Sequence, residues 1–169
     1  RPIPRWRAMT FNDRTTPLSL LSTRRSGKPR DLIAPGPDPD QLRAILTIAT
    51  RTPDHGKLFP WRFVTITDRD AFAALLHAAA TNDPAAPAPA ALDLFAQQSP
   101  TLIAVLSTPV RPHKIPVWAQ ELSAGAACIN LLHAAHALGF AGGWLSGWAS
   151  YQEQVLAALG GQPGDRIAG

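Results

Sequence analysis

Residues 101–107 read Thr-Leu-Ile-Ala-Val-Leu-Ser, and this apolar run is the clearest structural signal in the chain. Its length and aliphatic side chains are typical of a buried β-strand. A helical pattern follows at 118–138 and ends at Gly139, a residue type that commonly terminates helices. One face of this helix carries Leu122, Ala126, Ile129 and Leu132. A buried strand next to a long helix predicts a mixed α/β or α+β fold.

The rest of the chain alternates between helical and strand patterns. Helices are expected at 17–23, 41–50, 70–80, 91–97 and 151–159. Strand patterns occupy 62–67 and the glycine-rich 140–147, and 165–169 has the pattern of the approach to another strand. The stretch 84–90 contains three prolines, so we expect a mobile surface loop there.

Length and composition restrict the classes of protein that fit. The chain has 169 residues, 46% of them apolar, which is enough for one domain with its own core. Its one cysteine, Cys128, excludes an intramolecular disulfide and a zinc site of several thiolates. No apolar stretch approaches the ~20 residues of a membrane span, and no signal peptide is visible. We therefore expect a cytoplasmic protein without a membrane partner.

The net charge of +4 comes mainly from the first eight residues. Arg1, Arg5 and Arg7 account for three of the 16 basic residues, which leaves 13 against 12 acidic residues in the rest of the chain. We expect residues 1–8 to be a non-native or disordered extension and 9–169 to be a single domain. The charge outside the extension is too balanced to predict nucleic-acid binding.

Several motifs of enzyme chemistry are absent from the sequence. There is no glycine-rich dinucleotide fingerprint and no phosphate loop that ends in Gly-Lys-Ser/Thr. His133 and His136 are spaced to share a metal on one helix, but no Asp, Glu or Cys lies near enough in sequence to complete a metal site. We therefore favour solvated or hydrogen-bonded histidines and expect no metal. Cys128 lies in an alanine-rich helical stretch and is expected to be a small buried residue.

Basic residues cluster in the turn after the first predicted helix. Arg24, Arg25 and Ser26 are followed by Lys28 and Arg30. Two guanidinium groups and a hydroxyl suit a phosphate or another compact dianion, because arginine binds such groups through paired hydrogen bonds. A solvated basic turn accounts for the same residues equally well, so these residues alone leave both interpretations open.

A second group of cations lies in the loop before the predicted strand at 62–67. Arg51 and His55 occur there, and Pro53 and Pro60 restrict the backbone on either side of the imidazole. Functional residues are often held on such loops. A capped turn without a ligand is the alternative interpretation.

Four sequence blocks, taken in order, resemble one family. They are Leu-Leu-Ser-Thr-Arg-Arg-Ser at 20–26, Arg-Thr-Pro-Asp-His-Gly-Lys-Leu-Phe-Pro-Trp-Arg-Phe at 51–63, Gln-Glu-Leu-Ser-Ala-Gly-Ala-Ala at 120–127 and Gly-Gly-Trp-Leu-Ser-Gly at 142–147. Together they are similar to the FMN-dependent nitroreductase family, above all to its compact bacterial NAD(P)H branch. The resemblance implies an α+β fold, an α/β sandwich with a central, mostly antiparallel sheet flanked by helices. Relatives continue with a final strand and a tail, so we expect the sequence to be truncated and its C-terminal strand to be missing.

The resemblance also assigns roles to residues of the basic turn. Arg24 and Ser26 would hold the FMN phosphate and ribityl chain, with Arg25 beside them. Lys28 would lie near the N1/O2 edge of the flavin, where a positive charge stabilises the reduced cofactor. These roles favour the anion-binding interpretation of the turn.

The remaining implied contacts come from three other segments. Arg51 and His55 would reach FMN from the partner subunit of a homodimer. The residues that would border the flavin ring are Gly125, Trp144, Leu145 and Ser146. Leu145 stands where relatives carry arginine, so one polar contact would be absent, and Lys57 stands where many other branches carry asparagine.

The activity that the resemblance implies needs no catalytic residue from the protein. NAD(P)H would pass a hydride to N5 of the flavin, and a nitroaromatic, quinone or similar electron-poor acceptor would then take the reducing equivalents in a ping-pong cycle. The alternative from another class is a flavin-binding carrier or sensor without reductase turnover.

Overall fold

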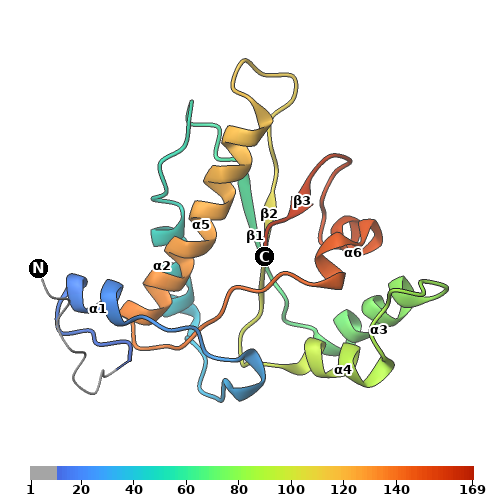
Figure 1. The fold of residues 1–169 in the computed structure, drawn as a ribbon, viewed down its shortest axis with the longest axis horizontal. Helices are drawn as coiled ribbons and strands as arrows, with labels where there is room; N and C mark the ends of the chain where they lie inside the picture. The colour runs from blue at the N-terminus through green and yellow to red at the C-terminus, as the bar shows by residue number, and fades with distance from the viewer. Residues whose placement is uncertain (1–10) are drawn as a thin grey trace, which may run out of the picture.

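The computed structural model describes residues 11–169, so the extension expected at 1–8 lies outside the described residues (Figure 1). The elements in chain order are α1 (Pro17–Thr23), the 3₁₀ helix η1 (Pro29–Asp31), α2 (Pro39–Ala49), β1 (Trp61–Thr65), α3 (Arg69–Ala80), α4 (Pro89–Gln97), β2 (Ile103–Ser107), α5 (Val117–Ala137), the 3₁₀ helix η2 (Trp148–Tyr151), α6 (Glu153–Ala158) and β3 (Arg166–Ile167). All predicted helices are present, with ends within two residues of the predicted ones. No helix in the described part of the chain is long and apolar enough to cross a membrane.

Helix ends follow from local side-chain chemistry. Asp38 Oδ1 accepts the Gln41 N–H at 2.8 Å, and Gln41 Oε1 accepts the Asp38 N–H at 3.0 Å, so the two side chains cap the first turn of α2. Asp68 accepts the Ala71 N–H at 2.9 Å and caps α3 in the same way. Gly139 follows α5 with a φ of 97°, a conformation that glycine adopts without strain.

The three strands form an antiparallel sheet in the order β1-β2-β3. Trp61 pairs with Ser107 and Thr65 with Ile103 between β1 and β2, and Ile167 pairs with Leu106 between β2 and β3. The apolar run at 103–107 is therefore the central strand, and its last four residues are buried. The expected antiparallel character of the sheet is confirmed. Residues 165–169 were expected only to approach a further, missing strand, but Arg166 and Ile167 themselves form the short strand β3 and pair with the end of β2.

Helices cover the sheet in two groups. In Figure 1, α2 and α5 lie on one side of the strands, and α3, α4 and α6 lie on the other. Trp61 of β1 packs on Ala124 and Ala127 of α5. The second group has its own apolar cluster, which consists of Phe72, Leu76, Leu92, Ala96 and Val155. The sheet therefore lies between two separate apolar clusters, one with α5 and one with α3, α4 and α6.

Two sequence expectations need correction or refinement. The strand expected at 140–147 is wrong, because these residues pair with no strand and instead cross between α5 and β3 as an extended segment. Glycines in this segment leave few side chains to pack on a sheet face, and its backbone bonds go to a turn rather than to a strand. On α5, Leu132 of the expected face is buried, and the buried positions include small residues such as Ala124 and Ala127, whereas Leu122 is 54% exposed.

Candidate functional site

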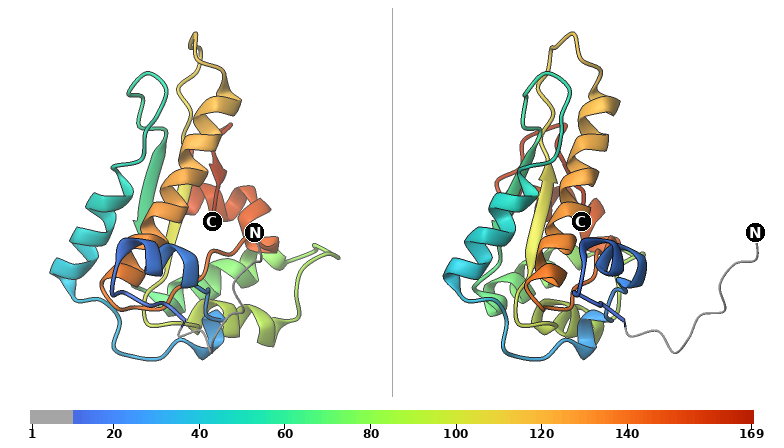
Figure 2. Two further views of the ribbon diagram at one scale, coloured as in Figure 1. Left: turned by 60° about the vertical axis from the view of Figure 1, so that its left-hand side comes forward. Right: turned by 90° about the vertical axis from the view of Figure 1, so that its left-hand side faces the viewer.

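The basic turn lies beside the C-terminal end of the longest helix. Figure 2 shows α1 and the chain that follows it against the lower part of α5. The Thr16 hydroxyl caps α1 by accepting the Ser19 N–H at 2.9 Å, and the Arg24 N–H bonds to the Leu20 carbonyl at 2.8 Å. Arg24 is therefore the first residue beyond α1, and the turn from 24 to 28 begins at a defined point.

Hydrogen bonds from three other segments fix the backbone of this turn. The Arg25 N–H bonds to Asn12 Oδ1 at 2.8 Å, and the Arg25 carbonyl lies 3.2 Å from His136 Nε2. The Gly27 N–H bonds to the Gly142 carbonyl at 3.2 Å. The turn is therefore joined both to α5 and to the glycine-rich segment.

The two arginines of the turn point in different directions. Arg24 Nη1 lies 3.4 Å from the Ser26 hydroxyl oxygen, so these two polar groups are together. The Arg25 guanidinium lies over the Phe11 ring, 5.8 Å from its centroid, in a cation–π contact. Lys28 is exposed. Arg24 and Ser26 are thus the pair of donors that the turn offers to an anion.

The glycine-rich segment contacts both the basic turn and α5. A Cβ on Gly143 would come within 2.9 Å of the Gly27 carbonyl, so the two segments touch where neither has a side chain. A Cβ on Gly125 would lie 3.6 Å from the Trp144 ring. The indole N–H of Trp144 bonds to the Ala168 carbonyl at 2.8 Å, which fixes that ring.

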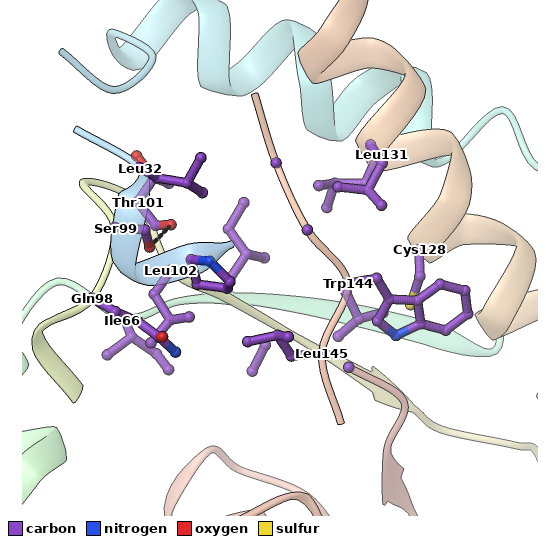
Figure 3. Close-up of a pocket in the computed structure, with 18 of the residues that line it drawn as sticks. Leu32, Ile66, Gln98, Ser99, Thr101, Leu102, Cys128, Leu131, Trp144 and Leu145 are labelled. Carbon is purple, nitrogen blue, oxygen red and sulfur yellow. Dashed lines mark hydrogen bonds between the residues drawn. The ribbon is translucent and has the colours of Figure 1, made fainter. Parts of the chain in front are cut away.

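An apolar cavity of about 190 Å³ lies along this segment (Figure 3). Trp144, Leu145 and Ser146 line it from one side, and Leu131 and Cys128 line it from α5. None of the described residues around it carries a charge. The cavity therefore suits an apolar ring or chain, whereas an anion would bind outside it at the turn.

Cys128 faces this cavity but is chemically quiet. Burial raises the pKa of its thiol to about 12, so the thiol is protonated at neutral pH. A protonated thiol is a poor nucleophile. This agrees with the expectation of a small buried residue and gives the cavity no reactive group.

His133, a residue of α5, lies near Arg24 of the basic turn. Burial, the charge of Arg24 and neighbouring His136 lower the pKa of His133. Its Nδ1 atom is buried and has no hydrogen-bond partner among the described residues. No group of three His, Cys, Asp or Glu side chains comes together in the described part of the chain. His133 therefore adds an unpaired polar atom next to Arg24 rather than a metal ligand.

Arg51 and His55 are not brought to this turn within one chain. Both are exposed, and neither lines the cavity. Their loop instead follows α5: Thr52 Oγ1 accepts a hydrogen bond of 2.7 Å from Asn130 Nδ2, and a Cβ on Gly56 would lie 3.1 Å from Ile115, just before the helix. The predicted site residues thus form two separate groups in a single chain.

Sequence reasoning missed two residues that hold the turn. Asn12 and His136 contact Arg25 from positions 13 residues before it and 111 residues after it. The spacing of His133 and His136 places both on one side of the helix, and solvated or hydrogen-bonded histidines are the interpretation favoured from the sequence. No sequence pattern indicated that this side of the helix faces the turn.

Comparison with known proteins identifies the family of this chain. The sequence model of the nitroreductase family matches residues 21–169. The chain belongs to the nitroreductase family. This nitroreductase is 38% identical over 157 residues to YdjA of Escherichia coli K12, which covers 90% of this chain and 84% of YdjA. It is 36% identical over 155 residues to a relative from Haemophilus influenzae, which covers 89% of this chain and 83% of the relative. Both relatives carry the name of NAD(P)H nitroreductases.

Solved structures show the same fold at lower identity. A nitroreductase-like protein from Bacillus cereus superposes with a TM-score of 0.75 at 20% identity, covering 99% of this chain and 85% of that protein. A nitroreductase-type protein from Desulfovibrio desulfuricans, solved in complex with FMN, gives a TM-score of 0.67 at 24% identity, covering 90% of this chain and 81% of that chain. The expected α+β fold is thereby confirmed.

Proposed function

We propose that this nitroreductase is an FMN-dependent oxidoreductase that transfers hydride from NAD(P)H to electron-poor acceptors such as nitroaromatics and quinones. The observation that carries the proposal is the joint position of Arg24 and Ser26 on a turn that bonds to the glycine-rich segment. Family membership and the names of the relatives support the enzyme class, and the FMN complex of a structural relative supports the cofactor.

The hydrogen-bond donors of the turn are suited to a phosphate monoester. Arg24 would bind phosphate oxygens through charged hydrogen bonds, and the Ser26 hydroxyl would add a neutral one. Lys28, exposed beyond the turn, would contribute positive charge toward the edge of the flavin.

The glycine-rich segment fits the border of a flat ring. Trp144 and Leu145 would provide apolar contacts that exclude water, and the Ser146 hydroxyl would offer one hydrogen bond. Gly125, next to Trp144, would keep the helix surface free of side chains at that place. When bound, FMN supplies the hydride chemistry at its N5 atom, so the chain needs no nucleophile or base of its own.

A second copy of the chain would complete the site. Trp118 and Leu122, one helical turn apart on α5, are 69% and 54% exposed and form an apolar surface that suits a symmetric partner. Arg51 and His55 face away from their own turn and would contact the FMN of the other subunit. NAD(P)H and the acceptor would then use the same space in turn, in a ping-pong cycle.

The direct test is to add FMN to the purified protein and follow NADPH oxidation with menadione or a nitrofuran as acceptor. We expect a yellow protein that oxidises NADPH only when the acceptor is present. A yellow protein without turnover would favour the alternative, a flavin carrier or sensor. A protein that does not bind FMN would contradict both.

A further inference from the structure

A buried histidine joins α5 to the middle of the basic turn. His136 is 1% exposed, and its Nε2 lies 3.2 Å from the Arg25 carbonyl oxygen. Its Nδ1 lies 2.6 Å from the Leu132 carbonyl on the same helix, which fixes the ring. Both ring nitrogens face carbonyl oxygens, which only accept hydrogen bonds, and a neutral imidazole has one N–H. The contact with Arg25 is a hydrogen bond in the tautomer that carries the hydrogen on Nε2, and we adopt that tautomer.

The peptide groups of Arg25 are held from two directions. Asn12 Oδ1 accepts the Arg25 N–H at 2.8 Å, while His136 Nε2 lies 3.2 Å from the Arg25 carbonyl oxygen. The Arg25 side chain itself lies over Phe11 and away from Ser26. Arg25 therefore influences the conformation of the turn through its backbone. That backbone connects the two proposed phosphate donors, Arg24 and Ser26.

We propose that His136 is a positioning residue for the FMN phosphate. This inference rests on the proposed function, and it names a residue that makes no contact with the cofactor. By holding the Arg25 carbonyl, the ring fixes the peptide that joins Arg25 to Ser26, and with it the direction of the Ser26 hydroxyl and its partner Arg24. Binding groups need such support, because donors that shift by about 1 Å lose much of their effect.

The position of His136 makes this support rigid. It lies in the last turn of α5, where Ala134 and Ala135 pack on Ile45 of α2. A ring fixed in this packed layer moves less than a side chain in a loop. The backbone bond between Gly27 and Gly142 holds the far end of the turn, so His136 and Gly142 together fix the two sides of Ser26.

The experiment compares two flavins and two substitutions. FMN and riboflavin differ in the phosphate, and their dissociation constants can be measured by the quenching of flavin fluorescence on the full chain. His136→Leu removes the N–H at similar volume, whereas His136→Gln keeps an N–H near the same place. His77→Gln on α3 serves as the control for changing a histidine elsewhere.

We expect His136→Leu to weaken FMN binding roughly three- to tenfold, the effect of one lost hydrogen bond, and to leave riboflavin binding within about twofold. His136→Gln and His77→Gln should stay close to the unchanged chain with both flavins. Equal loss of FMN and riboflavin affinity in His136→Leu would overturn the inference, because it would indicate a general packing role. Unchanged FMN affinity in His136→Leu would also overturn it.

A second variant covers the case in which His136→Leu does not fold. Asn12→Ala releases the neighbouring peptide, which joins Arg24 to Arg25, and should likewise produce a loss for FMN but not for riboflavin. Equal binding of FMN by Asn12→Ala and the unchanged chain would then overturn the inference. If the unchanged chain binds neither flavin, the proposed function fails; if it binds FMN and only the variants behave otherwise than expected, the inference alone fails.

Discussion

The basic turn after α1 and the loop before β1 both carry cationic side chains. They differ in whether other residues of the same chain lie beside those side chains. The turn is tied to α5 and to Gly142, and its Arg24 and Ser26 lie together. The loop is also well built, since Asp54 accepts the Phe59 N–H at 2.5 Å and Asn130 bonds to Thr52. Nevertheless, its Arg51 and His55 are exposed.

This difference indicates how the proposed site divides between subunits. A loop with several internal bonds and with positive φ angles at Lys57 and Phe59 holds a costly conformation, and such cost is commonly found where a segment serves a ligand or a partner. In the proposed dimer, the turn would provide one half of the site, and the loop of a second copy would provide the other half. The following substitutions test whether the turn and the loop contribute to one site from different subunits, and they are given in order of decreasing expected effect.

The largest effect is expected from a charge on the exposed apolar face of α5. Leu122→Asp should raise the dimer dissociation constant at least about a hundredfold, because the new carboxylate would be buried in the proposed interface. FMN binding should weaken with it, since Arg51 and His55 of the partner would be lost. Size-exclusion chromatography with light scattering measures the first effect. Leu94→Asp on α4, equally exposed at 54%, should remain dimeric.

Removal of the Arg24 guanidinium tests the turn itself. Arg24→Ala should weaken FMN binding by about 10- to 150-fold, the worth of a charged hydrogen bond of roughly 1.5–3 kcal/mol. Arg30→Ala is the control, because Arg30 is exposed and is paired only loosely with Asp31 at 3.9 Å. Retention of flavin by Arg24→Ala after dialysis, at the level of Arg30→Ala, would contradict the assignment.

The neighbouring arginine should matter much less. Arg25→Ala removes a guanidinium that lies over Phe11, and it leaves the backbone contacts of the turn in place. We expect FMN affinity to change by less than about fivefold, since an exposed cation–π contact is worth roughly 0.5–1 kcal/mol. A loss as large as that of Arg24→Ala would show that both guanidinium groups bind the anion.

The smallest effect concerns pH. The lowered pKa of His133 means that the folded chain binds a proton less readily there than the unfolded chain, whose histidine titrates near about 6.5. The free energy of unfolding should therefore fall as the pH drops below about 6.5. His133→Gln should reduce this dependence in urea titrations between pH 5 and pH 8. An equal pH dependence in the variant and the unchanged chain would show that His133 does not cause it.

The sequence predicted the elements of the fold better than their surfaces. The run at 103–107 and the Asp38 cap carry local signals that place a strand and a helix start. Which face of α5 is buried depends instead on how closely α2 and the sheet approach, and small residues such as Ala124 and Ala127 permit that close contact. The 140–147 segment has strand-like composition, but its neighbours, which no local pattern encodes, leave it unpaired.

The candidate site was predictable where its residues are adjacent in sequence. Arg24 and Ser26 are two residues apart in the sequence, and the structure places their side chains together. The contact between His136 and Arg25 spans 111 residues, and a single sequence contains no signal for it. Contacts of this kind depend on tertiary packing, and they decide how the predicted donors are held.

The most direct test of the divided site is a mixed dimer of Arg24→Ala and Arg51→Ala chains, isolated with two different affinity tags. If the two residues serve one FMN from different subunits, the mixed dimer has one intact site and one doubly altered site. We predict that half of its sites bind FMN with the affinity of the unchanged protein, whereas neither parent variant has such a site. A mixed dimer in which no site regains that affinity would contradict the account.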